Sequence, residues 1–144
     1  MYIGFLHLHD TLRWLLLLGI VIILVKYLTG WLGAKPWTKG DNILGIVFTS
    51  IMDLQFLTGI VLYFFLSPVT KQAFADFGAA MKDSDLRFYA VEHITMMFVA
   101  IILVHIGRAK SKKSKTDVAK FKTAFIYFLI ATVIIIAAIP WSKM

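Results

Sequence analysis

The chain has 144 residues, of which 60% are hydrophobic, its net charge is +7, and its mean hydropathy is +0.82. Soluble domains are about 45–50% apolar, so this composition excludes an ordinary soluble protein and indicates an integral membrane protein. The sequence contains no cysteine, which excludes disulfides, iron–sulfur clusters, thiolate catalysis and thiolate-ligated haem. Metal chemistry is therefore restricted to His, Met and carboxylate ligands.

Four stretches are apolar enough and long enough to cross about 30 Å of hydrocarbon, which takes roughly 20 helical residues. They are approximately residues 2–28, 43–66, 86–107 and 123–141. The connections are too short to hold a second domain, so the sequence predicts an all-α, integral membrane four-helix bundle over residues 1–144. The N-terminus lacks a basic leader with a small-residue cleavage site, so we expect the first helix to be retained.

Charge predicts the orientation of this bundle. The first connection carries Lys26, Lys35 and Lys39 against Asp41, and the second balances acids with bases. The third sets seven basic residues against one acid, Asp117; the basic residues are Arg108, Lys110, Lys112, Lys113, Lys115, Lys120 and Lys122. By the positive-inside rule, the first and third connections are cytoplasmic, and both termini lie on the non-cytoplasmic side of a bacterial inner membrane. This topology explains the positive charge, so we expect no nucleic-acid partner.

Turn-forming residues mark the ends of the first two helices. Lys35-Pro36-Trp37 predicts a turn, and Asp41 or Asn42 is placed to cap the second helix. Ser67-Pro68 stops that helix, because proline lacks a backbone donor and disfavours helical geometry in the preceding residue. Residues 70–82 then form either a short amphipathic helix on the outer surface or a packed loop.

Polar residues inside a membrane span are costly, so each of them needs a partner or a function. In the first helix, His9, Asp10 and Arg13 share a sector of about 100°, whereas His7 points nearly the opposite way. The fourth helix has no ionisable residue in its core and is expected to act as a packing wall.

Two histidines on different helices suggest a cofactor. His93 lies roughly 10 Å from the outer end of its span, and His9 lies at a similar depth. Two imidazoles at matched depth can ligate one haem iron from opposite faces. The pattern therefore predicts one haem b near the outer face, bound by His93 and by His9 or His7, with Arg13 or Arg87 neutralising the propionates.

The remaining polar residues leave alternatives open. Asp53 and Gln55 near mid-bilayer and Glu92 beside His93 are candidates for a proton relay or for buried hydrogen-bonded groups. Asp53 is expected to be buried, and to be protonated, paired with Arg13 or reached by water. Either Asp53 or Glu92 could also pair with His93 and simply hold helices together. His105 is expected to be an interfacial residue at the cytoplasmic end.

Three motifs carry a resemblance to known proteins. They are His7-Leu8-His9-Asp10-Thr11-Leu12-Arg13-Trp14, Gln55-Phe56-Leu57-Thr58-Gly59 and Val91-Glu92-His93-Ile94-Thr95-Met96-Met97. With these motifs the chain resembles the small bacterial four-helix membrane proteins labelled cytochrome b-like. The general plan is similar to that of four-helix b-type cytochromes, which implies haem b and electron transfer. The second and fourth helices have no histidine, so at most one bis-His haem can be carried over from that plan.

Three functions compete on these grounds. The first is an electron-transfer protein that exchanges electrons with quinol or with a partner outside the cytoplasm. The second is a non-catalytic subunit that anchors or assembles a larger respiratory or other membrane complex. The third is a small transporter or proton-conducting bundle, which four helices favour least. No motif supports a catalytic reaction, and a homo-oligomer in the lipid bilayer is compatible with all three.

Overall fold

Residues 1–143 are described by a computed structural model, and over this range the chain forms helices and no strands. Four helical stretches are long enough and apolar enough to cross a membrane, as predicted. Their main elements are α1 (Tyr2–Leu32), α2 (Lys39–Val61), α6 (His93–Lys113) and α7 (Asp117–Ala138). The predicted end of the fourth helix is too late, because Ile139 is already extended and Pro140 cannot donate a backbone hydrogen bond.

Short helices connect α2 with α6. Two π-helical turns extend the long helices, η1 (Leu62–Leu66) after α2 and η2 (Phe88–Glu92) before α6. Between them lie α3 (Pro68–Ala75), α4 (Phe77–Ala80) and α5 (Ser84–Arg87), and the chain continues after α7 into η3 (Trp141–Lys143). The stretch 70–82 is therefore helical but interrupted at Asp76, which ends α3 and accepts a hydrogen bond from the backbone of Ala79 in α4.

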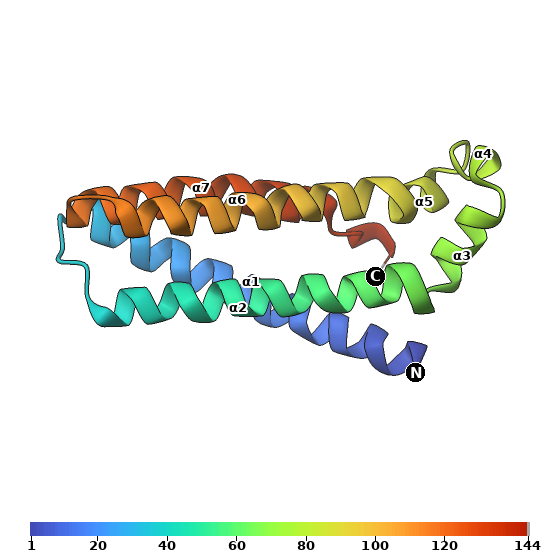
Figure 1. The fold of residues 1–144 in the computed structure, drawn as a ribbon, viewed down its shortest axis with the longest axis horizontal. Coiled ribbons are helices and arrows are strands. Elements are labelled where there is room, and N and C mark those ends of the chain that lie inside the picture. Colours follow the sequence, from blue (N-terminus) through green and yellow to red (C-terminus); the bar gives the residue numbers. More distant parts are fainter. Residues whose placement is uncertain (144) are drawn as a thin grey trace.

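The long helices form an antiparallel bundle. Helix α1 packs against α2 and α7, and α6 packs against α7 and α2. Figure 1 shows that the connections 33–38 and 114–116 lie at one end, which we call the basic end, and that α3, α4, α5 and both chain ends lie at the other, which we call the terminal end. The two basic connections thus share one end of the bundle, as the charge pattern predicts.

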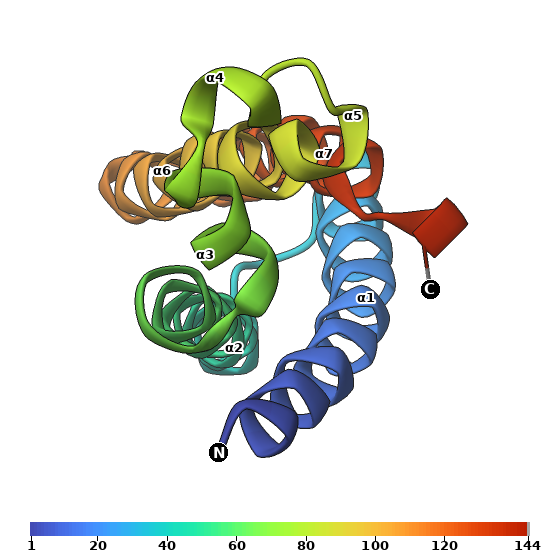
Figure 2. The same cartoon turned by 90° about the vertical axis from the view of Figure 1, so that its right-hand side faces the viewer.

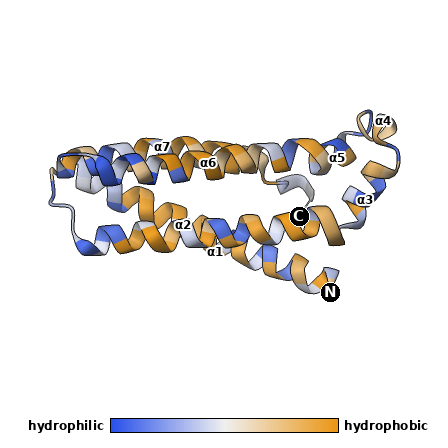
Figure 3. Cartoon of the chain, in the orientation of Figure 1, coloured by the Kyte–Doolittle hydropathy of each residue, from blue (hydrophilic) through white to orange (hydrophobic). Residues whose placement is uncertain are grey.

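The helices are apolar on their outward faces as well as on the faces buried in the core. Leu16, Ile23 and Phe128 are among the buried core residues, and large apolar side chains are also exposed on every long helix. Leu57 on α2 and Val133 on α7, for example, have 58% and 61% of their surface exposed. In Figure 3, hydrophobic residues cover the middle of the bundle and hydrophilic residues gather toward its ends. Such a surface is compatible with contact to a lipid bilayer.

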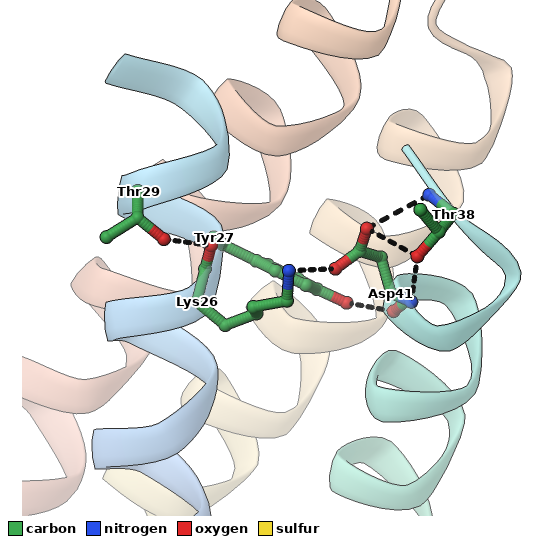
Figure 4. Close-up of polar contacts among 5 residues, drawn as sticks. All are labelled: Lys26, Tyr27, Thr29, Thr38 and Asp41. Atoms are coloured by element: carbon green, nitrogen blue, oxygen red, sulfur yellow. Dashed lines mark hydrogen bonds and ion pairs between the residues drawn. The ribbon is translucent and has the colours of Figure 1, made fainter. Parts of the chain in front are cut away.

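Asp41 closes the basic end between α1 and α2 (Figure 4). Its side chain accepts hydrogen bonds from the backbone and hydroxyl of Thr38, both at 2.9 Å, and pairs with Lys26 at 3.3 Å. Its backbone carbonyl accepts the hydroxyl of Tyr27 at 2.7 Å. The cap of α2 is therefore Thr38, with Asp41 completing a capping box, and neither Asp41 nor Asn42 is the cap. The carboxylate is almost fully buried; its Oδ2 accepts both hydrogen bonds from Thr38, and its Oδ1 is compensated by the Lys26 charge alone.

Helix α1 changes neighbours along its length. At the basic end it lies against α7, where Gly30 leaves room for the ring of Phe121. Toward the terminal end it diverges from α6 and α7 and crosses toward α2 (Figures 1 and 2). The bundle is therefore tightly packed at the basic end and opens at the terminal end, where the predicted site residues lie.

Candidate functional site

A cavity of about 650 Å³ occupies the open, terminal end of the bundle. Residues of α1, α2, α3, α6, α7 and the segment after α7 line it, together with both π-helical turns. Its size falls within the roughly 300–1,000 Å³ that is usual for cofactor and small-molecule sites. The polar residues that bear on its chemistry are His9, Asp10, Arg13, Gln55, Tyr63 and His93. The structure thus brings together His9, Arg13, Gln55 and His93, which the sequence analysis selected from three separate helices.

His93 is held in one tautomer. Its Nδ1 lies 2.8 Å from the backbone carbonyl oxygen of Ala138, which can only accept a hydrogen bond, so Nδ1 carries the hydrogen. In a neutral imidazole this leaves Nε2 with a free lone pair. No residue in the described part of the chain hydrogen-bonds to His93 Nε2, and the ring borders the cavity.

His9 is also held with its hydrogen on Nδ1, in this case by a hydroxyl group. Its Nδ1 lies 3.1 Å from Thr58 Oγ1, and Thr58 donates its only hydroxyl hydrogen to the backbone carbonyl of Gln55 at 2.8 Å. Thr58 therefore accepts from His9 Nδ1, and the lone pair is again on Nε2. His9 and His93 both border this one cavity.

The backbone and ring of His9 are fixed from α2. Gln55 donates its side-chain amide to the backbone carbonyl of His9 at 2.9 Å, in the span where helix α1 diverges. Gly59 lies directly beneath the imidazole, because a Cβ atom at that position would come within 3.2 Å of His9 Cε1. The Gln55-to-Gly59 motif is thus the surface on which His9 rests.

Arg13 places a positive charge at the cavity wall. Its Nη1 pairs with Asp10 at 3.3 Å, and its guanidinium lies 5.2 Å from the ring centre of Trp14. Its Nε is buried and has no hydrogen-bond partner within residues 1–143. An unpaired buried donor is costly, so this guanidinium is suited to an anionic group in the cavity.

The two π-helical turns are joined above the cavity. Tyr63 in η1 donates its hydroxyl to the backbone carbonyl of Ala90 in η2 at 2.6 Å, and Thr70 donates to the carbonyl of Tyr63 at 2.8 Å. Turns of this type are rare and often mark functional sites. The sequence analysis assigned no role to Tyr63, Thr58 or Thr70, since hydroxyl residues within apolar helices are also typical of ordinary packing.

Several predicted site residues lie elsewhere. His7 is exposed on the opposite face of α1, and Arg87 pairs with Glu92 at 2.7 Å outside the cavity. Asp53 is not buried, contrary to our expectation. It points outward from α2 and pairs with His105 of α6 rather than with an arginine. His105 is thus a partner of Asp53 and not an isolated interfacial residue.

Within the described residues there is no group of three or more His, Asp or Glu side chains that could hold a metal ion. A bare metal ion would find two imidazoles at the cavity, fewer than the three or four protein ligands that metal sites usually have. His9 and His93, each with Nε2 free, are the residues that could hold a metal-containing cofactor there. Comparisons with protein-family models, curated proteins and solved structures find no match to this chain.

Proposed function

We propose that this protein is a membrane b-type cytochrome-like electron-transfer protein with one haem b held by His9 and His93. One observation carries the proposal. Two imidazoles from different helices border one cavity, and each uses Nδ1 in a hydrogen bond that leaves Nε2 free. Second hydrogen bonds of this kind are characteristic of metal-ligating histidines, because they fix the tautomer and the ring orientation.

The other cavity residues fit the same group. Apolar side chains, including Leu16, Met52, Met97 and Ile135, line much of the cavity, as the apolar faces of a haem require. Arg13 provides a cation for a haem propionate, and its Nε is free to donate. When bound, haem b supplies reversible one-electron chemistry whose potential depends on axial ligands and burial.

The chain's own residues orient and shield this site. The Ala138 carbonyl and the Thr58 hydroxyl hold the two imidazoles, and Gln55 holds the backbone of α1 beside α2. The Tyr63 bond to Ala90 keeps the two π-helical turns together over the cavity. These bonds preorganise the ligands before any cofactor enters, which reduces the ordering cost of binding.

We also propose that the four long helices cross a bacterial inner membrane with the basic end in the cytoplasm. The apolar outward faces and the lysine-rich connections support this placement. The cavity then lies near the non-cytoplasmic face, where quinol or an electron-transfer partner outside the cytoplasm can reach it. Arg87 remains on the same side but pairs with Glu92, so it has no assigned role in the cavity.

The decisive experiment is a reduced-minus-oxidised absorption spectrum of the detergent-purified protein, expressed with a haem supply. We expect a sharp bis-His haem b signal that is lost in His93→Ala and in His9→Ala. His7→Ala is the matched control, because His7 lies on the same helix but is exposed away from the cavity. Folded protein without a spectrum would refute the haem assignment and favour the non-catalytic anchoring subunit.

A further inference from the structure

An acid and a histidine face outward together in the middle of the bundle. Asp53 Oδ1 lies 2.5 Å from His105 Nε2, between α2 and α6, and each side chain is 50% exposed. Neighbouring outward positions on both helices are large and apolar, for example Leu57 and Ile102. On the proposed membrane placement, this pair therefore faces the hydrocarbon region. Polar groups in that position are costly and are usually covered by protein.

Each member of the pair has one unused hydrogen-bonding atom. His105 Nδ1 and Asp53 Oδ2 have no partner within residues 1–143. Lipid tails offer neither donors nor acceptors, so these atoms cannot be satisfied by the bilayer. In the ion-paired form of this contact, His105 has one N–H donor left on Nδ1, and Asp53 has acceptor capacity left on Oδ2. The unused donor of this pair and its unused acceptor therefore match each other.

We propose that the α2/α6 face around Asp53 and His105 is the contact surface for a second copy of this chain. In a two-fold arrangement the same patch meets itself, so His105 of each copy donates to Asp53 of the other. Both unused atoms are then satisfied in both copies, and no charge is left over. A different partner would need its own matching acid and base, whereas a second copy supplies them automatically.

The surroundings of the pair suit close helix packing. Ser50 lies one helical turn before Asp53 and is also exposed, so a small polar side chain stands beside the pair. Small and hydroxyl-bearing residues are enriched where membrane helices approach one another. Phe98 and Ile102 on α6 supply apolar contact area around the polar centre. The inference rests on the proposed membrane insertion but not on haem binding.

The absence of native cysteine permits a direct test by single-cysteine crosslinking in membranes. Ser50→Cys places a thiol beside the proposed two-fold axis, and Val133→Cys places one on the outward face of α7 as the matched control. We expect oxidation or a short bis-maleimide to give a dimer band with Ser50→Cys and not with Val133→Cys. A monomer, an adduct with another protein, or equal crosslinking at both positions would overturn the proposal.

The role of the charges is tested in the Ser50→Cys background. Asp53→Leu should reduce the dimer band at least tenfold, and the exchanged variant Asp53→His with His105→Asp should restore it. Carbonate-resistant recovery in membranes and helical circular dichroism verify that each variant is inserted and folded. A dimer band that is insensitive to Asp53→Leu, or that the exchange fails to restore, refutes the pairing. Wild-type protein recovered outside the membrane fraction would refute the membrane placement and this inference together, whereas a missing haem spectrum would leave this inference intact.

Discussion

His93 donates its Nδ1 hydrogen to the carbonyl oxygen of Ala138 at 2.8 Å, which ties the start of α6 to the end of α7. Ala138 is the last residue of α7, and the final carbonyls of a helix have no donor within that helix. The extended backbone at Ile139 and the proline that follows keep the helix from continuing. The early end of α7 thus provides the acceptor that orients His93.

Thr58 orients His9 as the Ala138 carbonyl orients His93. Thr58→Val removes the hydroxyl group and preserves the shape of the side chain. The hydroxyl acceptor at 3.1 Å disappears, so His9 Nδ1 loses its partner and the ring its fixed tautomer. Loss of such a second hydrogen bond typically weakens metal binding about 10–100-fold. We expect haem affinity, measured by titration of the apoprotein, to fall by at least about tenfold.

Thr49→Val is the matched control for that variant. Thr49 is also buried on α2, but its hydroxyl bonds only to the backbone carbonyls of Gly45 and Ile46, one turn earlier. Haem affinity should remain at the wild-type value. Equal losses in the two variants would show that the Thr58 bond to His9 has no specific role.

Gly59→Ala tests the surface beneath His9. The added Cβ would lie 3.2 Å from His9 Cε1, so the ring must move away from its position above α2. Alanine also favours the helix by about 0.5–1 kcal/mol, so the fold should be as stable as before or more stable. We expect less haem per protein in the absorption spectrum with an unchanged or higher melting temperature. Gly19→Ala, where the nearest atom is at 3.7 Å, should keep full haem content.

Substitutions of Arg13 and Arg87 distinguish a cation at the cavity wall from a cation in a surface ion pair. Arg13→Gln removes the charge at the cavity wall, and hydrogen bonds to charged groups contribute about 1.5–3 kcal/mol. Haem affinity should therefore fall about tenfold or more. Arg87→Gln breaks the exposed pair with Glu92 and the hydrogen bond to the backbone carbonyl of Met81, and neither contact borders the cavity, so haem titration should give the wild-type affinity. A larger effect from Arg87→Gln would contradict the proposed propionate site.

The sequence was sufficient to predict the four long helices, because about 20 apolar residues in a row have few alternatives in any fold. It also placed His9 and His93 on different helices at similar depth, since residue counting along two helices gives depth directly. Both histidines do border one cavity. Counting along a helix does not determine which face points inward, however, and Asp53 was assigned to the interior for that reason.

The residues that the sequence analysis missed make contacts between helices, and helical periodicity does not predict such contacts. Asp53 pairs with His105, 52 positions away, because α2 and α6 are neighbours on the outer side of the bundle. The bond between Tyr63 and Ala90 requires two π-helical turns, and one extra residue per turn leaves no signature in an apolar sequence. Thr58 acquires its role only because the divergent end of α1 places His9 beside it.

Asp41→Ala should destabilise the bundle without altering the cavity. The substitution leaves Thr38 as the cap of α2 but removes both hydrogen bonds from Thr38 to the Asp41 carboxylate and the pair with Lys26. Each hydrogen bond contributes about 0.5–1.5 kcal/mol, so we expect the free energy of unfolding, measured by denaturant titration in detergent, to fall by about 1–2 kcal/mol. Asp117→Ala at the same end is the control, because Asp117 is exposed and Thr116 caps α7. That change should cost less than about 0.5 kcal/mol.

The orientation of the bundle is measurable with single cysteines at its two ends. Lys115→Cys lies in the basic connection between α6 and α7, and Ser84→Cys begins α5 at the terminal end; both positions are exposed. In intact spheroplasts a membrane-impermeant maleimide should label Ser84→Cys at once and Lys115→Cys only after lysis, because lysine-rich connections stay in the cytoplasm. The reverse pattern would place the His9 and His93 cavity at the cytoplasmic face, and its electron partner would then have to be sought inside the cell.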